Sequence, residues 1–274
     1  MNAKGTALVT GASRGIGRAV ALELDRRGFD VLATMRDPDD GSGLEEASVG
    51  GRLRTAALDV TDASRFEIPS DLSVLVNNAG IEGDHLPVEH APMKLWRELF
   101  ETNLFGLIEV TRRALPALRQ NRGVLCNVTS CSILLPVPFF AAYRASKAAV
   151  SALGESLRAE LAQTGVRVLE VLPGAIRTDM LTGSERVPEA AAFEPYRAIA
   201  ETMHGMRLAS KDAFEEADVA ARSIVDAILD PEAALRHAPD PMSAGLLAAW
   251  KASDDESMMG AMLSSLAEES DSSD

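Results

Sequence analysis

A glycine-rich turn near the start of the chain joins a short apolar run to an amphipathic segment. Residues 5–10 predict a buried strand, and the segment after the turn, to about residue 27, predicts a helix with one apolar face. Glycines allow a backbone to approach a phosphate, and free N–H groups at a helix N-terminus favour its charge. The turn predicts either a pyrophosphate site or a tight connection, and its place after the first strand favours the site. Its candidate binding residues are Gly11, Ser13, Arg14, Gly15, Ile16 and Gly17.

Apolar runs and amphipathic segments continue to alternate along the chain, which is typical of an α/β fold with a parallel sheet. Further strands are predicted at 29–34, 52–58, 72–76, 123–128, 166–172 and 235–238. Helices are predicted at 92–120, 142–164, 194–206, 215–229, 243–251 and 255–267. We expect a doubly wound α/β fold with a parallel sheet of about seven strands.

No linker or internal repeat divides the sequence, so the whole chain, 1–274, is predicted to be one domain with its core at 4–230. An irregular stretch at 179–212, next to the edge where ligands bind in such folds, predicts a lid over a substrate. A helical extension is expected at 231–266. The acidic, serine-rich tail at 267–274 is expected to be disordered.

The net charge of −14 limits what the chain can bind. Nucleic acids and anionic membranes require a basic surface, so neither is an expected partner. The sequence has no run of about 18 apolar residues and no basic region followed by a long apolar one, which predicts no membrane span and no signal peptide. The two cysteines, Cys126 and Cys131, form no CxxC motif and favour a reducing compartment, so we expect a cytoplasmic protein.

The end of the second predicted strand indicates which dinucleotide the chain prefers. An acidic residue at this position holds the adenosine ribose hydroxyls of NAD, whereas an arginine accommodates the 2′-phosphate of NADP. Met35 and Arg36 occupy this corner, and Asp37 comes one position later than a ribose-binding carboxylate would. Arg14 of the glycine turn can reach the same corner. The pattern favours NADP(H), and NAD(H) stays possible if Arg36 is only a surface residue.

Candidate ligand contacts also follow three other predicted strands. Asp59 and Val60 end the third strand, where the carboxylate either accepts from an adenine amino group or caps the next helix. The sequence Asn-Asn-Ala-Gly at 77–80 either leaves room for a flat ligand or forms a simple turn. Pro173 and Gly174 close the sixth strand and bring the residues after them over the same edge.

Tyr143 and Lys147 lie four residues apart in a predicted helix, so both side chains project from one face. An ammonium about 4 Å from a phenol, at an effective dielectric near 20, favours the phenolate by roughly 4 kcal/mol, or about 3 pKa units before desolvation. Such a tyrosine is suited to general acid/base catalysis near neutral pH. The pair alone is also common on solvated helices. Ser130 follows the fifth predicted strand and reaches the same edge of the sheet.

Asn103 lies among apolar residues in the middle of the predicted helix at 92–120. A buried amide is unfavourable unless it has hydrogen-bond partners. Asn103 is therefore either a satisfied structural amide or part of a functional kink. Gly106 nearby favours a local irregularity in the helix.

These motifs, in this order and spacing, resemble the short-chain dehydrogenase/reductase family over about residues 4–230. The resemblance rests on Thr10 to Gly17, residues 77–80, Asn103, Ser130, the Tyr143-x-x-x-Lys147 pair and Pro173-Gly174. It implies a Rossmann-type fold, a nicotinamide cofactor, and a homodimer or homotetramer assembled through the helices at 92–120 and 142–164.

The resemblance also implies a role for each candidate residue. Tyr143 exchanges a proton with the substrate oxygen, while Lys147 lowers the tyrosine's pKa and holds the nicotinamide ribose. Ser130 hydrogen-bonds the substrate carbonyl, and Asn103 holds a water that links Lys147 to solvent. Asp59 and Val60 contact the adenine. Other implied cofactor contacts are Asn77, Ala79, Gly80, Pro173, Gly174, Ile176 and Thr178.

The end of the chain departs from the Asp-Gly-Gly ending of many reductases in this family. Its Leu235 to Pro239 segment and helical extension look more like steroid and retinol dehydrogenase-like members. That likeness implies a bulky apolar ketone or secondary alcohol as substrate, and an NADP(H)-dependent oxidoreductase that interconverts the two. Residues that either line such a pocket or pack in the core are Ile133, Leu134, Leu135, Phe139 and Phe140.

Two other functions remain open at this point. One is an NAD-dependent alcohol or steroid-type dehydrogenase, which Met35 in place of an acid disfavours. The other is a non-catalytic nucleotide-binding sensor or scaffold, which has no need of all four candidate catalytic residues. No catalytic metal is expected, because metal-ligand spacing is missing from His85, His90, His204 and His237.

Overall fold

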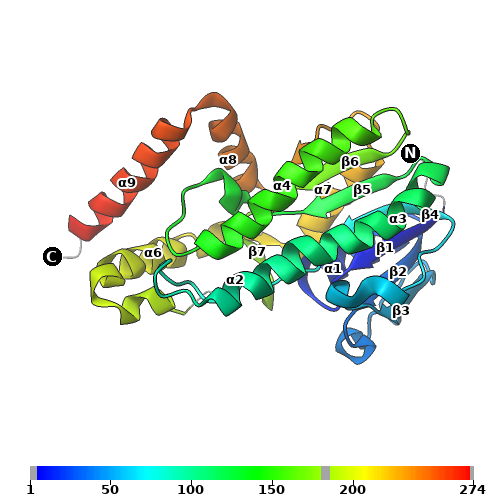
Figure 1. Cartoon of the computed structure of the whole chain (residues 1–274), viewed down its shortest axis with the longest axis horizontal. Helices are drawn as coiled ribbons and strands as arrows, with labels where there is room; N and C mark the ends of the chain where they lie inside the picture. The colour runs from blue at the N-terminus through cyan, green and yellow to red at the C-terminus, as the bar shows by residue number, and fades with distance from the viewer. Residues whose placement is uncertain (1–4, 180–185, 272–274) are drawn as a thin grey trace.

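Seven strands form a parallel sheet through the centre of the molecule (Figure 1). The structure is a computed structural model that describes residues 5–179 and 186–271. In chain order the strands are β1 (Thr6–Thr10), β2 (Asp30–Met35), β3 (Leu53–Ala57), β4 (Leu72–Asn77), β5 (Val124–Val128), β6 (Arg167–Val171) and β9 (Arg236–His237). Across the sheet the order is β3-β2-β1-β4-β5-β6-β9, and every neighbouring pair is parallel. The predicted doubly wound sheet is confirmed, including its short edge strand.

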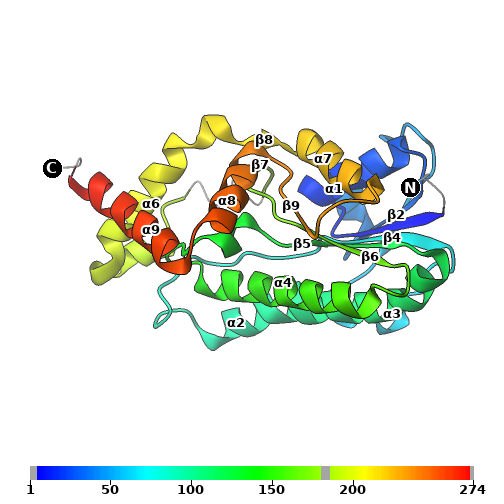
Figure 2. The same cartoon turned by 90° about the horizontal axis from the view of Figure 1, so that it is seen from above.

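Helices cover both faces of this sheet (Figure 2). On one face lie α1 (Gly15–Arg26) and α7 (Ala217–Leu229), and on the other lie α3 (Leu107–Asn121) and α4 (Ala141–Leu161). Strands covered on both faces have continuous apolar sequences, and all six residues of β4 are buried. One core cluster joins the sheet to Val20, Leu24 and Ile224. The other joins it to Val110 and Leu157.

The order of the strands reverses between β3 and β4. The first three strands follow one another toward one edge, and the chain then returns to place β4 on the other side of β1. At such a reversal the loops that follow the two strands diverge to opposite faces and leave a crevice at their carboxyl ends. The glycine turn after β1 and residues 78–80 after β4 both lie at this crevice.

The predicted helix at 92–120 is interrupted in its middle. It consists of α2 (Met93–Phe100), a π-helical turn at Glu101–Gly106, and α3. Gly106 packs closely against the segment after β3, because a Cβ on Gly106 would lie 2.8 Å from Cγ2 of Val60. Single π-helical turns inside α-helices occur frequently at functional sites. The irregularity expected near Asn103 and Gly106 is confirmed.

Three helices extend beyond the sheet at the end of the molecule far from the N-terminus (Figure 1). They are α6 (Arg197–Ala209), α8 (Pro241–Ala252) and α9 (Asp255–Asp271), and α9 packs beside α6. A small parallel ladder of β7 (Ile176–Arg177) and β8 (Glu215–Glu216) contacts α7. After β9, the regular structure of the described part of the chain consists of α8 and α9.

Helix α9 continues beyond the point where disorder was expected. The tail was predicted to be disordered from residue 267, but the helix ends only at Asp271, since alanine and glutamate favour helix in this stretch. Residues 272–274 and residues 180–185 of the expected lid lie outside the described residues. Within the described ranges, no helix combines the length and the apolar character that crossing a bilayer requires.

Candidate active site

A cavity of about 1280 Å³ opens at the carboxyl edge of the sheet and extends from the glycine turn to the C-terminal helices. The predicted site residues that line it are Gly11, Ser13, Arg14, Gly15, Ile16, Arg36, Asp59, Val60, Ala79, Gly80, Ser130, Tyr143, Lys147, Pro173, Gly174, Ile176 and Thr178. Three other predicted site residues do not line this cavity, namely Gly17, Asn77 and Asn103. The fold thus brings candidates from distant parts of the sequence to one site.

The backbone of the turn after β1 requires its glycines. Gly11 has φ +64° and Gly15 has φ +56°, values that residues with a Cβ rarely adopt. A Cβ on Gly11 would lie 2.7 Å from Cα of Ala79, and one on Gly17 would lie 2.3 Å from the Gly11 carbonyl oxygen. Gly17 therefore serves the packing of α1 against the turn. The side chain of Arg14, the N-cap residue of α1, makes no capping hydrogen bond, which leaves first-turn N–H groups available to an anion.

Asn78 ties the loop after β4 to the glycine turn. Its Nδ2 donates to the carbonyl oxygens of Thr10 and Gly11, at 3.0 Å each. The backbone N–H groups of Asn78 and Ala79 donate in turn to Oγ1 of Thr10, also at 3.0 Å. These four bonds hold the two sides of the crevice at a set separation.

Asn77, which was predicted to flank the cofactor, lies in the core instead. It is 3% exposed, and its Nδ2 donates to Thr111 Oγ1 at 2.8 Å and to Asn127 Oδ1 at 3.0 Å. Asn77 is the last residue of β4 and pairs in register with Asn127 of β5. A side chain within a strand points to one covered face of the sheet, whereas residues 78–80 have left the sheet and meet the cavity.

Arg14 and Arg36 line the end of the cavity next to β2. The carboxylate of Asp37 does not face a ligand alone, because it accepts a hydrogen bond from the N–H of Asp39 at 3.0 Å and caps a short helical turn.

Asp59 also acts as a cap: its carboxylate accepts from Thr61 N at 2.9 Å and Thr61 Oγ1 at 2.7 Å. These bonds, together with the charge of Arg36, lower the pKa of Asp59. The capping alternative is therefore confirmed for Asp59, which also lines the cavity.

Tyr143 and Lys147 project from the first two turns of α4 into the cavity that Ser130 also lines. Lys147 is 5% exposed, and its Nζ donates to the Val128 carbonyl oxygen at 2.9 Å and lies 6.0 Å from the centre of the Tyr143 ring. Oγ of Ser130 accepts from the N–H of Ser132 at 3.2 Å. Because that bond uses only a lone pair, the Ser130 hydroxyl can donate its proton to a ligand.

The direction in which the pKa of Tyr143 shifts differs from the expectation. Burial raises the pKa of Tyr143, the Glu82 carboxylate raises it further, and the Ser130 hydroxyl lowers it. Burial also lowers the pKa of Lys147 to about 8. The predicted lowering of the tyrosine's pKa by Lys147 is wrong for the chain alone, because desolvation of the phenolate outweighs an ammonium that lies 6.0 Å from the ring centre.

Asn103 is a satisfied structural amide, and it lies within the π-helical turn. It is 1% exposed; its Oδ1 accepts from Ile81 N at 2.8 Å, and its Nδ2 donates to Ile81 O at 2.9 Å and to Ser146 Oγ at 3.0 Å. A Cβ on Gly80 would lie 3.1 Å from Asn103 Oδ1 and 3.2 Å from Lys147 Nζ. The amide and the ammonium therefore flank the same glycine.

The wall of the cavity beyond Tyr143 contains many apolar side chains among polar ones such as His204 and Arg207, and it comes from several segments. Of the residues predicted to line a substrate pocket, Leu135 and Phe140 do so, whereas Ile133 and Leu134 pack against Leu172 and the C-terminal helices. The C-terminal part of the chain contributes lining residues that the sequence did not reveal, namely Met203, Met206, Phe214, Met242, Leu246 and Met262. No motif or periodicity marks these residues, because only the packing of α6, α8 and α9 brings them here.

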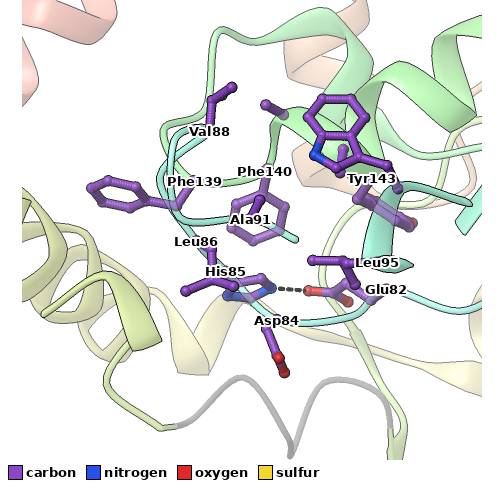
Figure 3. Close-up of a pocket in the computed structure, with 13 residues that line it drawn as sticks. Glu82, Asp84, His85, Leu86, Val88, Ala91, Leu95, Phe139, Phe140 and Tyr143 are labelled. Carbon is purple, nitrogen blue, oxygen red and sulfur yellow. Dashed lines mark hydrogen bonds and ion pairs between the residues drawn. The ribbon is translucent and has the colours of Figure 1, made fainter. Parts of the chain in front are cut away.

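A small pocket adjoins the cavity beside Tyr143 (Figure 3). Glu82 and His85 lie in it, with Oε1 of Glu82 2.6 Å from Nε2 of His85. The His85 ring centre lies 4.0 Å from that of Phe140. The sequence offers His85 only as a possible metal ligand, and no motif in it includes Glu82. Across residues 5–179 and 186–271, no three or more His, Cys, Asp or Glu side chains gather as a metal site would require.

Known proteins resemble this chain in sequence. A model of the short chain dehydrogenase family matches residues 5–188. Estradiol 17-beta-dehydrogenase 2 of Rattus norvegicus is 37% identical over 188 residues, which cover 64% of this chain and 49% of the rat protein. Short-chain dehydrogenase PC-15 of Penicillium crustosum is 34% identical over 244 residues, which cover 85% of this chain and 87% of the fungal protein. The chain thus spans about half the length of the rat relative.

Solved structures resemble it in fold. The crystal structure of a short chain dehydrogenase from Burkholderia cenocepacia in complex with NADP matches with a TM-score of 0.72 and 28% sequence identity. The match covers 94% of this chain and 97% of the Burkholderia chain. The likeness therefore extends over the sheet and its flanking helices.

Proposed function

Because the chain belongs to the short-chain dehydrogenase family, we propose that it is an NADP(H)-dependent oxidoreductase that interconverts a bulky apolar ketone and a secondary alcohol. The observation that carries the proposal is the position of Ser130, Tyr143 and Lys147 in one cavity with the glycine turn and two arginines. The apolar wall beyond Tyr143 supports a bulky apolar substrate.

The chain's own residues fit a phosphorylated dinucleotide. The positive φ angles of Gly11 and Gly15 and the uncapped start of α1 suit a pyrophosphate. Arg14 and Arg36 supply positive charge beside β2, and the carboxylate of Asp37 is hydrogen-bonded to the N–H of Asp39. Pro173, Gly174, Ile176 and Thr178 line the same cavity as Lys147, and these residues would hold the nicotinamide end. When bound, the nicotinamide would supply or accept the hydride.

In the direction of reduction, Tyr143 would give its proton to the carbonyl oxygen as that oxygen gains charge. A raised pKa keeps the phenol protonated at neutral pH, so it is ready to act as an acid. The Ser130 hydroxyl would donate a hydrogen bond to the same oxygen. Lys147, with a pKa of about 8, can exchange protons near neutral pH and would resupply the tyrosine. Asn103 holds Ile81 beside this group and would hold the water that leads to solvent.

Two structural features around the site extend the proposal. We infer that the described part of the predicted lid, residues 186–212, covers the substrate, since Met203 and Met206 of α6 line the cavity. We also infer a homodimer or homotetramer assembled through α2, α3 and α4. On this helical layer Met93 is 60% exposed and Phe105 is 52% exposed, and light scattering of the purified protein would measure the assembly.

The test is a side-by-side fluorescence titration of the purified protein with NADPH and NADH, followed by reduction assays on bulky ketones. We expect tighter binding of NADPH and consumption of NADPH that depends on the ketone. Preference for NADH would favour an NAD-dependent dehydrogenase and direct the search to alcohols. Binding of neither nucleotide would contradict the proposal, and nucleotide binding without turnover would favour a sensor or scaffold.

A further inference from the structure

A carboxylate and an imidazole lie beside Tyr143 without a part in the proposed proton transfer. Oε1 of Glu82 and Nε2 of His85 are 2.6 Å apart, and the two side chains are 17% and 13% exposed. Figure 3 shows the pair below Phe140 and Tyr143, with the hydrogen bond drawn between them. An acid–base pair in a largely apolar substrate region is costly to desolvate and calls for a physical explanation.

The backbone holds this pair firmly in place. Both the N–H and the carbonyl oxygen of Ile81, the residue before Glu82, are bound by the Asn103 amide. Gly83 has φ +78°, and a Cβ there would lie 2.6 Å from Cδ1 of Leu95, so the turn after Glu82 tolerates only glycine. The N–H of His85 donates to Oε2 of Glu189 at 3.1 Å. Glu82 is therefore a preorganised group and not a free surface side chain.

Glu82 also lines the cavity into which Tyr143 projects. Glu82, His85, Phe140 and Tyr143 line both the small pocket and the large cavity. The carboxylate of Glu82 contributes to the raised pKa of Tyr143, which requires the two groups to be electrostatic neighbours. A carbonyl oxygen bound to Tyr143 would thus place the atoms next to the carbonyl carbon near Glu82.

The chemistry of the pair determines what it can recognise. A carboxylate only accepts hydrogen bonds, and His85 occupies one of its oxygens. The other oxygen, Oε2, has no hydrogen-bond donor among the described residues of the chain. The pocket around it is mostly apolar, with Leu86, Val88, Leu95, Trp96, Phe139 and Phe140 in its wall. A purely hydrocarbon substrate would leave this acceptor desolvated and unpaired, which disfavours its binding.

We propose that Glu82, oriented by His85, is a substrate-recognition residue that selects ketones carrying a hydroxyl or protonated amino group close to the carbonyl. This inference rests on the proposed function, because it identifies the substrate class of the same site. The shared chemistry is a hydrogen-bond donor within a few bonds of the reacting carbon. A hydroxyl would pair with Oε2 alone, whereas an ammonium would also neutralise the carboxylate.

Three ketones of nearly equal size test the proposal: α-hydroxyacetophenone, α-aminoacetophenone and propiophenone. They share a phenyl ketone and differ only in the hydroxyl, ammonium or methyl group on the α-carbon. Calorimetric titration of the whole 274-residue chain with NADPH present measures their binding without the need for turnover. We expect one or both donor-bearing ketones to bind about tenfold more tightly than propiophenone, as a charge-assisted hydrogen bond implies. The tighter of the two identifies the donor.

Variants of Glu82 and His85 distinguish a loss of substrate recognition from a general loss of binding. Glu82→Leu should abolish the preference over propiophenone, whereas Glu82→Gln should retain part of the preference for a hydroxyl and lose any preference for an ammonium. Glu98→Gln is the matched control, because Glu98 lines the large cavity but not the small pocket, and the preference should survive. His85→Leu should weaken the preference, and His85→Gln, which keeps a donor for Glu82, should restore it.

The outcomes distinguish this inference from the proposed function. Equal affinity for all three ketones, no binding of any of them, or a preference that survives Glu82→Leu would overturn the role of Glu82. Turnover is then measured separately through NADPH consumption. Reduction of all three ketones without preference would leave the oxidoreductase proposal standing and overturn the inference. A preference that depends on Glu82 without any turnover would support the inference and contradict the proposed reaction.

Discussion

The two ends of the cavity are built in different ways. The cofactor end consists of backbone and small residues, with the glycine turn held against Ala79 and Asn78 by contacts that leave no room for a Cβ. The substrate end consists of side chains from the loop after β4, from α6 and from the C-terminal helices. Backbone geometry tolerates little change, whereas a wall of methionine and phenylalanine adapts to different occupants. One end therefore suits a constant ligand, and the other can accommodate substrates of different shapes.

The proposed catalytic residues line the cavity between these two ends, and substitutions of them should give the largest effect. We expect Tyr143→Phe to lower kcat by about a thousandfold or more, because the general acid is lost. The affinity for NADPH should change little, since the ring itself is retained. Steady-state kinetics and a nucleotide titration of the same preparation measure both quantities. Activity close to that of the unchanged protein would contradict the assigned role.

A substitution at the cofactor end should damage both binding and stability. We expect Gly11→Ala to weaken NADPH binding by at least about tenfold and to lower the free energy of unfolding by about 1–3 kcal/mol, because φ is +64° and the new Cβ would meet Ala79. Titration and chemical denaturation measure these effects. The control is Gly43→Ala, at φ +77° with no atom within 4 Å of the new Cβ. Equal effects of the two variants on NADPH affinity would contradict the comparison.

The charge of the cofactor end should determine which dinucleotide binds. We expect Arg36→Asp to weaken NADPH binding by about tenfold to a hundredfold and to improve NADH binding relative to it, because a positive charge beside the 2′-phosphate is replaced by a negative one. The ratio of the two dissociation constants is the readout. Arg65→Asp, in the helical turn after Asp59 and not a cavity-lining residue, is the control. An unchanged ratio would mean that Arg36 is only a surface residue.

The substrate end should give the smallest and most selective effect. We expect Met206→Ala to raise KM for bulky ketones by about threefold to tenfold, since the lost apolar contact is that of one partly buried side chain. NADPH affinity should stay within about twofold. Leu208→Ala serves as the control on the same helix, because Leu208 is 41% exposed and does not line the cavity. A large loss of NADPH affinity in Met206→Ala would mean that the two ends are not independent.

Much of the cofactor end was predictable because it is local in sequence. A strand, a glycine turn and a helix place their own ligand groups, so the turn at 11–17 and its exposure to the cavity followed from order and spacing. The family prediction is confirmed by the match over residues 5–188. The place of Ser130, Tyr143 and Lys147 at the cavity was also predictable, since parallel strands bring their carboxyl ends to one edge. The i, i+4 spacing of Tyr143 and Lys147 needed only a helix.

The predictions that were wrong concern the surroundings of a residue and not its position in the chain. Asn77 was assigned to the cofactor, but its place as the last residue of β4 turns its side chain into the core. The pKa of Tyr143 was expected to fall, but burial and Glu82 raise it. Both outcomes depend on which groups pack nearby, and residue types and spacings carry little information about that.

The sequence by itself determined the doubly wound sheet, the glycine turn and the set of Ser130, Tyr143 and Lys147. Each of these follows from short-range pattern: apolar periodicity, glycine geometry and helical spacing. Only the tertiary structure decided what faces the substrate. It placed methionines of α6, α8 and α9 in the cavity wall and Glu82 with His85 beside Tyr143. Contacts between segments far apart in the chain arise from the packing of whole elements, and no local pattern in the sequence records them.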